Sequence, residues 1–172
     1  NVSTFYLPYA TAIPDGSFAY TVAGVDGDYI DLKKVEGVIP AGTATLISQV
    51  ELQNSGDAAD LNYLCGTAVD TYVQIESDYS YYVLEESEGT IWLLQDINVN
   101  EGRFLNNANK AYLKIPKTLV QDKSKLYIRG LSAPEQVDPS TCSHTTYNNG
   151  FCSNCGAYEP AVDSNSDGYY EI

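Results

Sequence analysis

The sequence predicts an all-β protein, a β-sandwich or flattened barrel followed by a small C-terminal zinc-knuckle-like appendage. Three observations predict this. Short stretches of alternating apolar and polar residues, separated by turn residues, fill residues 1–131. Long helical periodicity is absent from the chain. After residue 140, Val162 and Ile172 are almost the only aliphatic residues, so this part needs something other than a hydrophobic core to fold.

Two stretches predict β-hairpins. Residues 17–35 alternate apolar and polar side chains around Asp26-Gly27, a dipeptide that favours a two-residue turn because both positions must accept positive φ. Residues 79–96 predict a second hairpin, with the polar residues 86–89 as its loop.

Further strands are predicted in five short stretches rich in β-branched and aromatic residues: 3–9, 43–50, 71–75, 110–115 and 125–131. The similar segments 13–17 and 39–43 each predict a type I turn, with proline in the second position and glycine in the fourth. Only residues 56–65 suggest a helical turn.

The composition changes at residues 132–140, where two prolines and several polar residues without periodicity predict a linker. We therefore expect a β-sandwich-like domain at 1–131, a linker at 132–140, and a Cys/His segment with a tail at 141–172. Because the chain starts without Met and stops inside a polar run, we expect it to be part of a longer protein with flanking domains.

The chain is strongly acidic, with 23 Asp and Glu against nine Lys and Arg and a net charge of −14. Nucleic acids and anionic membranes attract cationic surfaces, so we expect neither as a partner. No apolar run approaches the roughly 20 residues that cross a bilayer, so we expect no membrane insertion.

Three of the four cysteines and the only histidine gather in one short segment, as Cys142-x-His144 and Cys152-x-x-Cys155. Three Cys and one His form a common tetrahedral set for structural zinc. Asn-Asn-Gly at 148–150 can fold the chain back between the two halves of the set. We predict that these four side chains bind one structural Zn²⁺.

Two other interpretations of this cluster stay open. A disulfide from Cys142 to Cys152 or Cys155 would leave an odd thiol. A redox-active Cys-x-x-Cys needs a helix N-terminus to lower the thiol pKa, and no helix is predicted there. If all four side chains bind zinc, the ion is closed to water and its role is structural.

A second metal site is weaker. Residues 163–168 match the first half of a calcium loop, but the acid required at its twelfth position would fall beyond Ile172. No helix pattern flanks the segment, and we interpret it as polar linker.

Catalytic groups are scarce. A hydrolytic triad needs a histidine, and zinc would occupy His144, so we expect no enzymatic activity. Cys65 is expected to be a buried core residue. A small glycoside hydrolase built on paired carboxylates is one alternative, although Glu85, Glu86 and Glu88 fall in a predicted hairpin loop, where acids are usually solvated.

Aromatic residues offer a second alternative. Tyr79 and Tyr81 are predicted on one strand face, with Trp92 in the partner strand. If exposed, these rings could stack on sugars, and the chain would be a carbohydrate-binding module. If buried, they are ordinary core residues, which is the interpretation we favour.

Several phrases within residues 3–130 together resemble a β-rich domain that recurs in large secreted and surface proteins of gut anaerobic bacteria: TFYLPYATAIPDGSFAYTV, VIPAGTATLI, NYLCGT, YYVLEE and KAYLKIP. The later stretch CSHTTYNNGFCSNCGAYEPA is similar to a Cys/His segment that commonly precedes further extracellular repeats in such proteins. Cys142, His144, Cys152 and Cys155 fall on its recurring positions. In that family the β-rich domain usually lies near the end of its chain, whereas here a tail follows it.

The resemblance implies an extracellular or cell-surface location and no assigned enzymatic activity. With the residue patterns, it predicts a non-enzymatic structural or adhesion module of a larger bacterial surface or secreted protein. Zinc would stand in for a core in residues 141–172, because metal binding to folded thiolates counts as folding free energy. The expected partners are flanking domains of the same chain and a host or dietary glycan or protein.

Overall fold

The computed structural model describes residues 2–53, 61–87, 90–95, 99–129 and 131, and the short strands 147–148 and 151–152. Only the backbone is described at residues 86–87 and 90–92 and in the two short strands. The chain divides into two compact units, Asn1–Ala133 and Pro134–Ile172. The predicted linker at 132–140 lies outside the described residues.

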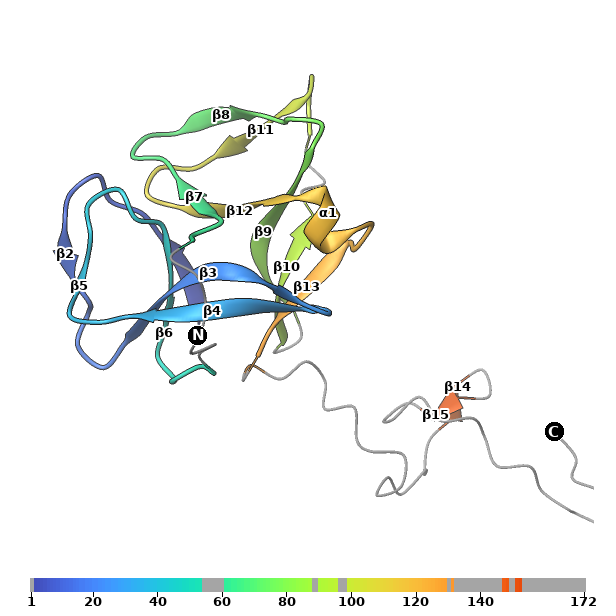
Figure 1. Ribbon diagram of the computed structural model, residues 1–172, viewed down its shortest axis with the longest axis horizontal. Coiled ribbons are helices and arrows are strands. Elements are labelled where there is room, and N and C mark those ends of the chain that lie inside the picture. The colour runs from blue at the N-terminus through green and yellow to red at the C-terminus, as the bar shows by residue number, and fades with distance from the viewer. Residues whose placement is uncertain are drawn as a thin grey trace, which may run out of the picture. The chain divides into compact units, whose positions relative to one another are not determined.

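The first unit is mostly β, and nine of its strands form one nearly closed, barrel-like sheet (Figure 1). The strand order is β1 (Val2–Phe5), β6 (Thr45–Ser48), β3 (Phe18–Asp26), β4 (Tyr29–Val35), β13 (Lys125–Ile128), β10 (Thr90–Gln95), β9 (Tyr79–Ser87), β12 (Ala111–Pro116) and β7 (Leu64–Gly66). Neighbouring strands are antiparallel except β4 and β13, which are parallel. The sheet curls until β1 contacts β12, near the opposite end of this order.

Smaller elements complete the described fold. β8 (Thr71–Gln74) pairs with β11 (Arg103–Asn106), and β2 (Thr11–Ala12) pairs with β5 (Val38–Ile39). A single-turn helix, α1 (Lys117–Val120), follows β12, and its Val120 is fully buried in the core. In the second unit β14 (Tyr147–Asn148) pairs with β15 (Phe151–Cys152). Among the described residues, no helix has the length and apolar character needed to cross a membrane.

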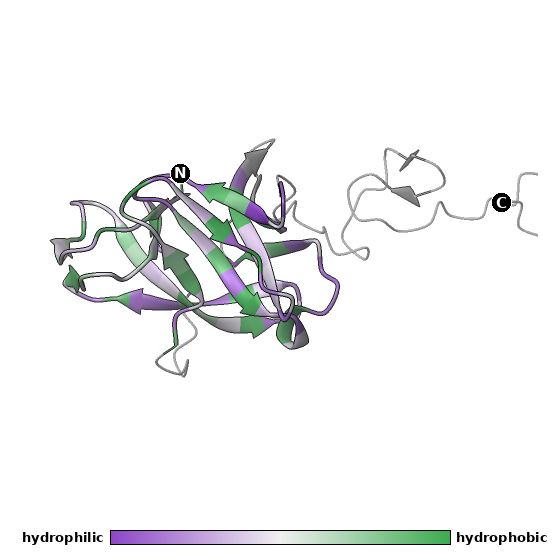
Figure 2. Cartoon of the chain, turned by 90° about the horizontal axis from the view of Figure 1, so that it is seen from above, coloured by the Kyte–Doolittle hydropathy of each residue, from purple (hydrophilic) through white to green (hydrophobic). Residues whose placement is uncertain are grey.

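The larger of two hydrophobic clusters gathers residues from both ends of the strand order, including the fully buried Tyr20, Tyr82 and Leu113. Both tyrosine hydroxyls have partners, as buried polar groups require. Tyr82 donates to the Lys123 carbonyl at 2.7 Å, and the Tyr20 hydroxyl accepts from the Leu52 N–H at 2.8 Å. Figure 2 shows hydrophobic and hydrophilic residues alternating along several strands, as expected for strands with one buried face.

A second cluster forms where the β8–β11 ribbon packs over β9 and β12. It contains Tyr81, Phe104 and Tyr112. The Phe104 ring meets both tyrosine rings edge-on, with centroids 5.6 Å from Tyr81 and 5.2 Å from Tyr112. Tyr81 and Tyr82 are successive residues in different clusters, so β9 is buried on both faces.

One side chain, Asn62, joins three parts of the barrel. A β-bulge interrupts β3 between Val22 and Gly24. The Asn62 Oδ1 accepts from the N–H groups of Val22 at 3.2 Å and Leu64 at 3.1 Å, while its Nδ2 donates to the Ala44 carbonyl at 2.8 Å. The amide therefore replaces a backbone partner where the ladder between β3 and β6 stops.

The predicted strands are present in the described residues, but the first hairpin turns one residue later than predicted. Asp26 pairs with Tyr29, so Gly27-Asp28 forms the loop. Gly27 has a φ of 59°, and Asp28 is not among the residues with positive φ. Glycine in the first loop position with positive φ is the type II′ arrangement, which needs only one such residue.

The two proline turns are also displaced by one residue. Ser17 donates its N–H to the Pro14 carbonyl at 3.0 Å, so proline occupies the first position and not the second. Gly16, with a φ of 74°, then occupies the third position, where a positive φ defines a type II turn. Residues 40–43 repeat this arrangement, with a φ of 69° at Gly42. The prediction of type I turns is wrong, because the positive φ of each glycine places it in the third position of a type II turn.

Three further expectations change. Ser87 pairs with Thr90, so Glu85 and Glu86 belong to β9 and not to a hairpin loop. In the predicted helical turn at 56–65, the described residues 61–65 lead into β7 instead, because they hydrogen-bond to β3 and β12. The described helix is α1, and the short strands β2, β5, β7 and β11 were not predicted.

Candidate functional site

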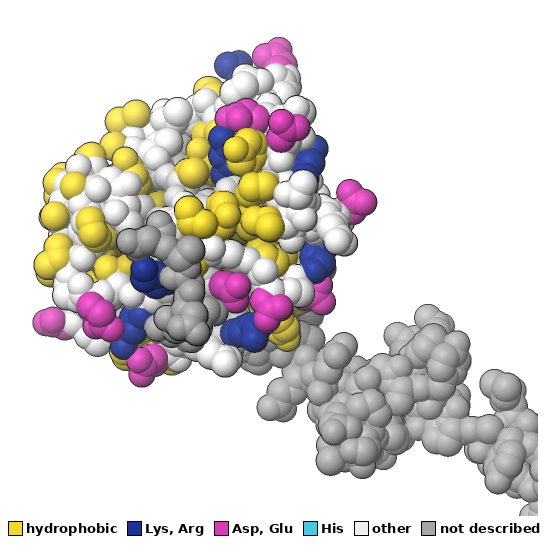
Figure 3. Space-filling view, in the orientation of Figure 1, with side chains coloured by type: hydrophobic (Ala, Val, Ile, Leu, Met, Phe, Trp, Pro, Cys, Tyr) yellow, Lys and Arg dark blue, Asp and Glu magenta, His cyan; other side chains and the backbone are white. Residues whose placement is uncertain are grey.

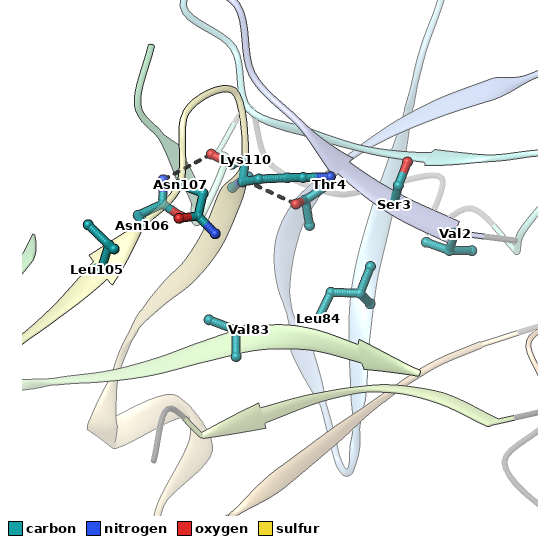
Figure 4. Close-up of a pocket in the computed structure, with 10 residues that line it drawn as sticks. Val2, Ser3, Thr4, Val83, Leu84, Leu105, Asn106, Asn107 and Lys110 are labelled. Atoms are coloured by element: carbon teal, nitrogen blue, oxygen red, sulfur yellow. Dashed lines mark hydrogen bonds between the residues drawn. The ribbon is translucent and has the colours of Figure 1, made fainter. Parts of the chain in front are cut away.

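A cavity of about 340 Å³ opens where the barrel-like sheet does not close (Figure 4). It lies between β1 on one side and β9 with the start of β12 on the other, and the turn after β11 forms its rim. Its lining is aliphatic, hydroxyl, amide or amine in character and includes Val2, Thr4, Leu84, Asn106, Asn107 and Lys110. We call it the seam cavity.

At one end of the seam, β1 is held against the start of β12. The Tyr6 N–H donates to the Asn109 carbonyl at 3.0 Å, and the Ala111 N–H donates to the Thr4 hydroxyl at 3.1 Å. The Tyr6 ring also lies so close to Gly66 that a Cβ there would come within 2.4 Å of it. The missing side chain of Gly66 therefore lets β1 approach β7.

Farther along the seam, the edge of β9 has no strand partner among the described residues. β12 pairs with β9 only as far as Leu113 opposite Tyr82. Continuing the register would place Ala111 opposite Leu84, but Ala111 donates to Thr4 instead. Backbone groups of alternate residues point to the same side of a strand, so the N–H and C=O of Leu84 face the seam, as those of Tyr82 face β12.

The outer edge of β1 faces the same space. The Tyr6 N–H points away from β6, toward Asn109. By the same alternation, the backbone groups of Thr4 and Val2 also point away from β6 and toward the seam. Two strand edges thus present peptide donors and acceptors to one cavity.

Asn106 fixes the rim of the cavity and is 5% exposed. Its Nδ2 donates to the Thr67 hydroxyl at 2.8 Å and to the Lys110 carbonyl at 3.1 Å. The second bond closes the turn in which Asn109 takes a φ of 61°, a conformation that Asn tolerates better than most residues. Because both amide hydrogens are used, the Oδ1 of Asn106 remains as an acceptor.

Lys110 gives the rim a positive charge. Its side chain is exposed and has no carboxylate partner among the described residues. Other bases in the described part of the chain do form ion pairs, among them Lys34 with Glu51, Arg103 with Glu101, Lys114 with Glu76, Lys123 with Asp28 and Arg129 with Asp26. Figure 3 shows such acids and bases side by side on one face of the first unit.

The predicted zinc ligands lie largely outside the described residues. Cys142, His144 and Cys155 are not described, and Cys152 is described only as backbone at the end of β15, opposite Tyr147. The pairing of β14 with β15 folds the chain back between residues 148 and 151, as predicted. Within the described ranges no three His, Cys, Asp or Glu side chains form a metal-binding group. The predicted calcium half-loop at 163–168 is also not described.

The tyrosines that would form a sugar platform in the less favoured alternative are not presented to solvent as that alternative requires. Tyr81 is 3% exposed, which contradicts its interpretation as an open stacking surface. Tyr79 is half-buried, with the Lys114 Nζ 4.3 Å from its ring centroid. Trp92 is described only as backbone, paired with Glu85 and Tyr127. The covering ribbon β8–β11, which alternation within β9 could not reveal, decides the burial of Tyr81.

An exposed aromatic ring occurs on that ribbon instead. Tyr72 is 62% exposed, and the Arg103 guanidinium carbon lies 4.5 Å from its ring centroid. Its cross-strand neighbour Leu105 is 48% exposed and also lines the seam cavity. Successive residues of β8 point to opposite faces, so Tyr72 points outward because its neighbour Val73 points inward. This alternation was the sequence signal that could have placed Tyr72 on the surface.

Cys65 is half-buried beside the second cluster and does not lie in the barrel core. Burial raises the pKa of its thiol, while the nearby Lys114 acts in the opposite direction. No Asp or Glu lines the seam cavity, so the paired carboxylates of a glycoside hydrolase are not found at this site.

The buried hydroxyl of Tyr112 is expected to make the first unit less stable at high pH. Burial, with a smaller contribution from Cys65, raises its pKa to about 12, whereas an unfolded tyrosine ionises near pH ~10. The folded state then holds the proton that the unfolded state loses, so this contribution is complete below pH ~10 and is lost as the pH rises to ~12. In urea unfolding, the free energy of unfolding of Tyr112→Phe should fall less than that of wild type across this pH window, by roughly 3 kcal/mol.

The matched control for this prediction is Tyr72→Phe, because that side chain is 62% exposed. It should keep the wild-type dependence of stability on pH. If Tyr112→Phe also keeps the wild-type dependence, the buried hydroxyl does not control stability in this range.

No protein-family model, curated protein sequence or solved structure matches the chain. The functional interpretation therefore depends on the residues and the geometry of the described units.

Proposed function

We propose that the chain is a non-enzymatic structural or adhesion module of a larger bacterial surface or secreted protein. The observation that carries this proposal is the character of the seam cavity. It offers peptide edges, amides, two hydroxyl groups, an ammonium group and aliphatic surface, but no carboxylate, thiol or imidazole among its lining residues. Such a lining favours binding over bond cleavage, because it lacks the carboxylate or imidazole that usually serves as the general acid or base and that activates a hydroxyl nucleophile.

The packing of the first unit supports a structural role as a rigid spacer. Two clusters bury β9 on both faces, and interactions across the seam join β1 to β12. A sheet that is packed on both faces and joined across the seam can hold attached regions at a fixed separation. The acidic composition suits a soluble, exposed surface.

In the second unit, the proposal includes a zinc staple made by Cys142, His144, Cys152 and Cys155. It is supported by the Cys3His set and by the scarcity of aliphatic residues in this part of the chain. The same pattern underlies the proposed extracellular setting, through the resemblance of the Cys/His segment to those of bacterial surface proteins.

Carbohydrate binding remains a second candidate, favoured by one observation. Tyr72 exposes a ring beside the exposed Leu105, near the seam cavity. Such a ring can stack on a sugar, although the neighbouring Arg103 lies over part of it.

One experiment separates binding from cleavage. The chain is applied to arrays of host and dietary glycans and to immobilised mucin, and the same polysaccharides are assayed for new reducing ends. We expect retention on at least one surface without release of reducing ends. Release that grows with protein concentration would replace the proposal with a glycoside hydrolase, and absence of retention on every surface would remove the adhesive role.

A further inference from the structure

We propose that the seam cavity binds an extended segment of a partner protein, which adds to the open edges of β1 and β9 and places an acidic side chain beside Lys110. The inference goes beyond the proposed function. It depends only on the first unit and would stand if the second unit bound no zinc.

The first step concerns hydrogen bonding. The backbone groups of Leu84 face the seam from one wall, and those of Thr4 and Val2 face it from the other. An extended peptide carries donors and acceptors with the same alternating spacing as a strand edge, so it can satisfy both walls. Open strand edges attract such segments unless charge, proline or a covering element blocks them.

The second step concerns the other contacts. The cavity of about 340 Å³ holds only a short stretch of chain. Leu84 packs against the first cluster and Val83 against the second, so the two side chains lie on opposite faces of β9 and would contact different residues of the guest. Asn107 lies at the rim (Figure 4). A guest strand paired with β9 would therefore carry an apolar side chain on the face that it shares with Leu84.

The third step concerns charge. Lys110 stands at the rim and has no carboxylate partner among the described residues. The chain as a whole has a net charge of −14, but salt screens distant charges beyond about 8 Å at physiological ionic strength. The local ammonium therefore decides the preference, and it favours Asp or Glu in the guest.

Other ligand classes fit this cavity less well. A divalent cation would need carboxylates, and none lines it. A sugar usually stacks on an aromatic ring, and none is among the lining residues. An extended peptide, in contrast, can bind through the strand edges, amide groups, aliphatic side chains and ammonium group that line the cavity.

The test is a titration of the ¹⁵N-labelled chain with a defined peptide pool, followed by nuclear magnetic resonance. The pool consists of N-acetylated, C-amidated pentapeptides of alternating Val and Thr, with one Asp at each position in turn. We expect the amide signals of Thr4, Leu84 and Ala111 to shift. A matched pool with methylated backbone nitrogens should bind at least about tenfold more weakly, because it lacks the donors of a strand.

Two charge variants complete the design. Lys110→Glu should weaken binding of the Asp pool by about fivefold and favour a pool with Lys in place of Asp. Lys117→Glu is the matched control, because Lys117 is another exposed lysine without a carboxylate partner among the described residues, and it lies on α1 away from the lining. The affinity of the Lys117→Glu variant for the Asp pool should match that of wild type.

Each other result would overturn the proposal. Absence of shifts at about 1 mM peptide would exclude strand addition of this kind. Equal affinity for the methylated pool would show that binding does not depend on hydrogen bonds from the peptide backbone. Shifts of Thr4 and Leu84 that depend on protein concentration alone would assign the seam to a second copy of this chain.

Discussion

Replacing Cys152 with Ser is expected to abolish binding of the proposed zinc ion, from about one per chain to none, and to unfold the second unit, Pro134–Ile172. Beyond residue 140 the aliphatic residues are almost limited to Val162 and Ile172, so burial of apolar surface cannot order this part. Zinc binding to Cys and His sets supplies on the order of 10 kcal/mol of folding free energy in small metal-dependent modules. This is the largest effect expected from a single substitution in the protein.

Elemental analysis measures the bound zinc, and limited proteolysis with and without chelator measures the order of the second unit. Cys65→Ser is the matched control, because Cys65 is half-buried beside the second cluster of the first unit. It should retain zinc and protease resistance. Metal-free protein in which titration finds two thiols missing would support the disulfide alternative and contradict the zinc staple.

Leu113→Ala is expected to lower the free energy of unfolding of the first unit by about 2–5 kcal/mol. Leu113 is fully buried and pairs with Tyr82 of β9 on one side and Leu64 of β7 on the other. Its truncation would leave a cavity where three strands meet. Urea unfolding followed by circular dichroism measures the change.

Leu105→Ala is the control for this second prediction. Leu105 is 48% exposed on β11, so the same truncation should change stability by no more than about 0.5 kcal/mol. Equal effects of the two substitutions would show that Leu113 is not a central core residue.

Sequence patterns located the strands well where alternation ran over several residues. The hairpin of β3 and β4 and the hairpin of β9 and β10 follow from two-residue periodicity with turn residues between. Short elements were missed for a physical reason. β7 has three residues, too few to show a period, and in β11 the exposed Leu105 next to the buried Phe104 breaks the apolar–polar alternation. Both strands form because neighbouring strands provide backbone partners.

Turn geometry was less predictable than strand position. The proline in residues 13–17 suggested the second place of a type I turn, whereas the positive φ of Gly16 moves the turn by one residue. A proline fixes its own φ and restricts the residue before it, which is compatible with more than one turn position, while a glycine with positive φ specifies the turn type. Glycine should therefore carry more weight in such motifs.

The seam cavity could not be derived from local patterns, because its walls come from distant parts of the chain. The hydrogen bond from Ala111 to Thr4 joins residues 107 positions apart. Hydroxyl and amide side chains such as Thr4 and Asn107 are common on any surface. Only the failure of β12 to continue along β9 makes them line one cavity.

The sequence by itself determined the all-β character of the first unit, the acidic surface and the clustering of three cysteines with the single histidine, because composition and two-residue alternation are local properties. Only the tertiary structure decided which strand edges stay open and that Tyr81 is buried by the β8–β11 ribbon. Those outcomes depend on how a curled sheet meets itself, which is set by contacts between residues far apart in the chain.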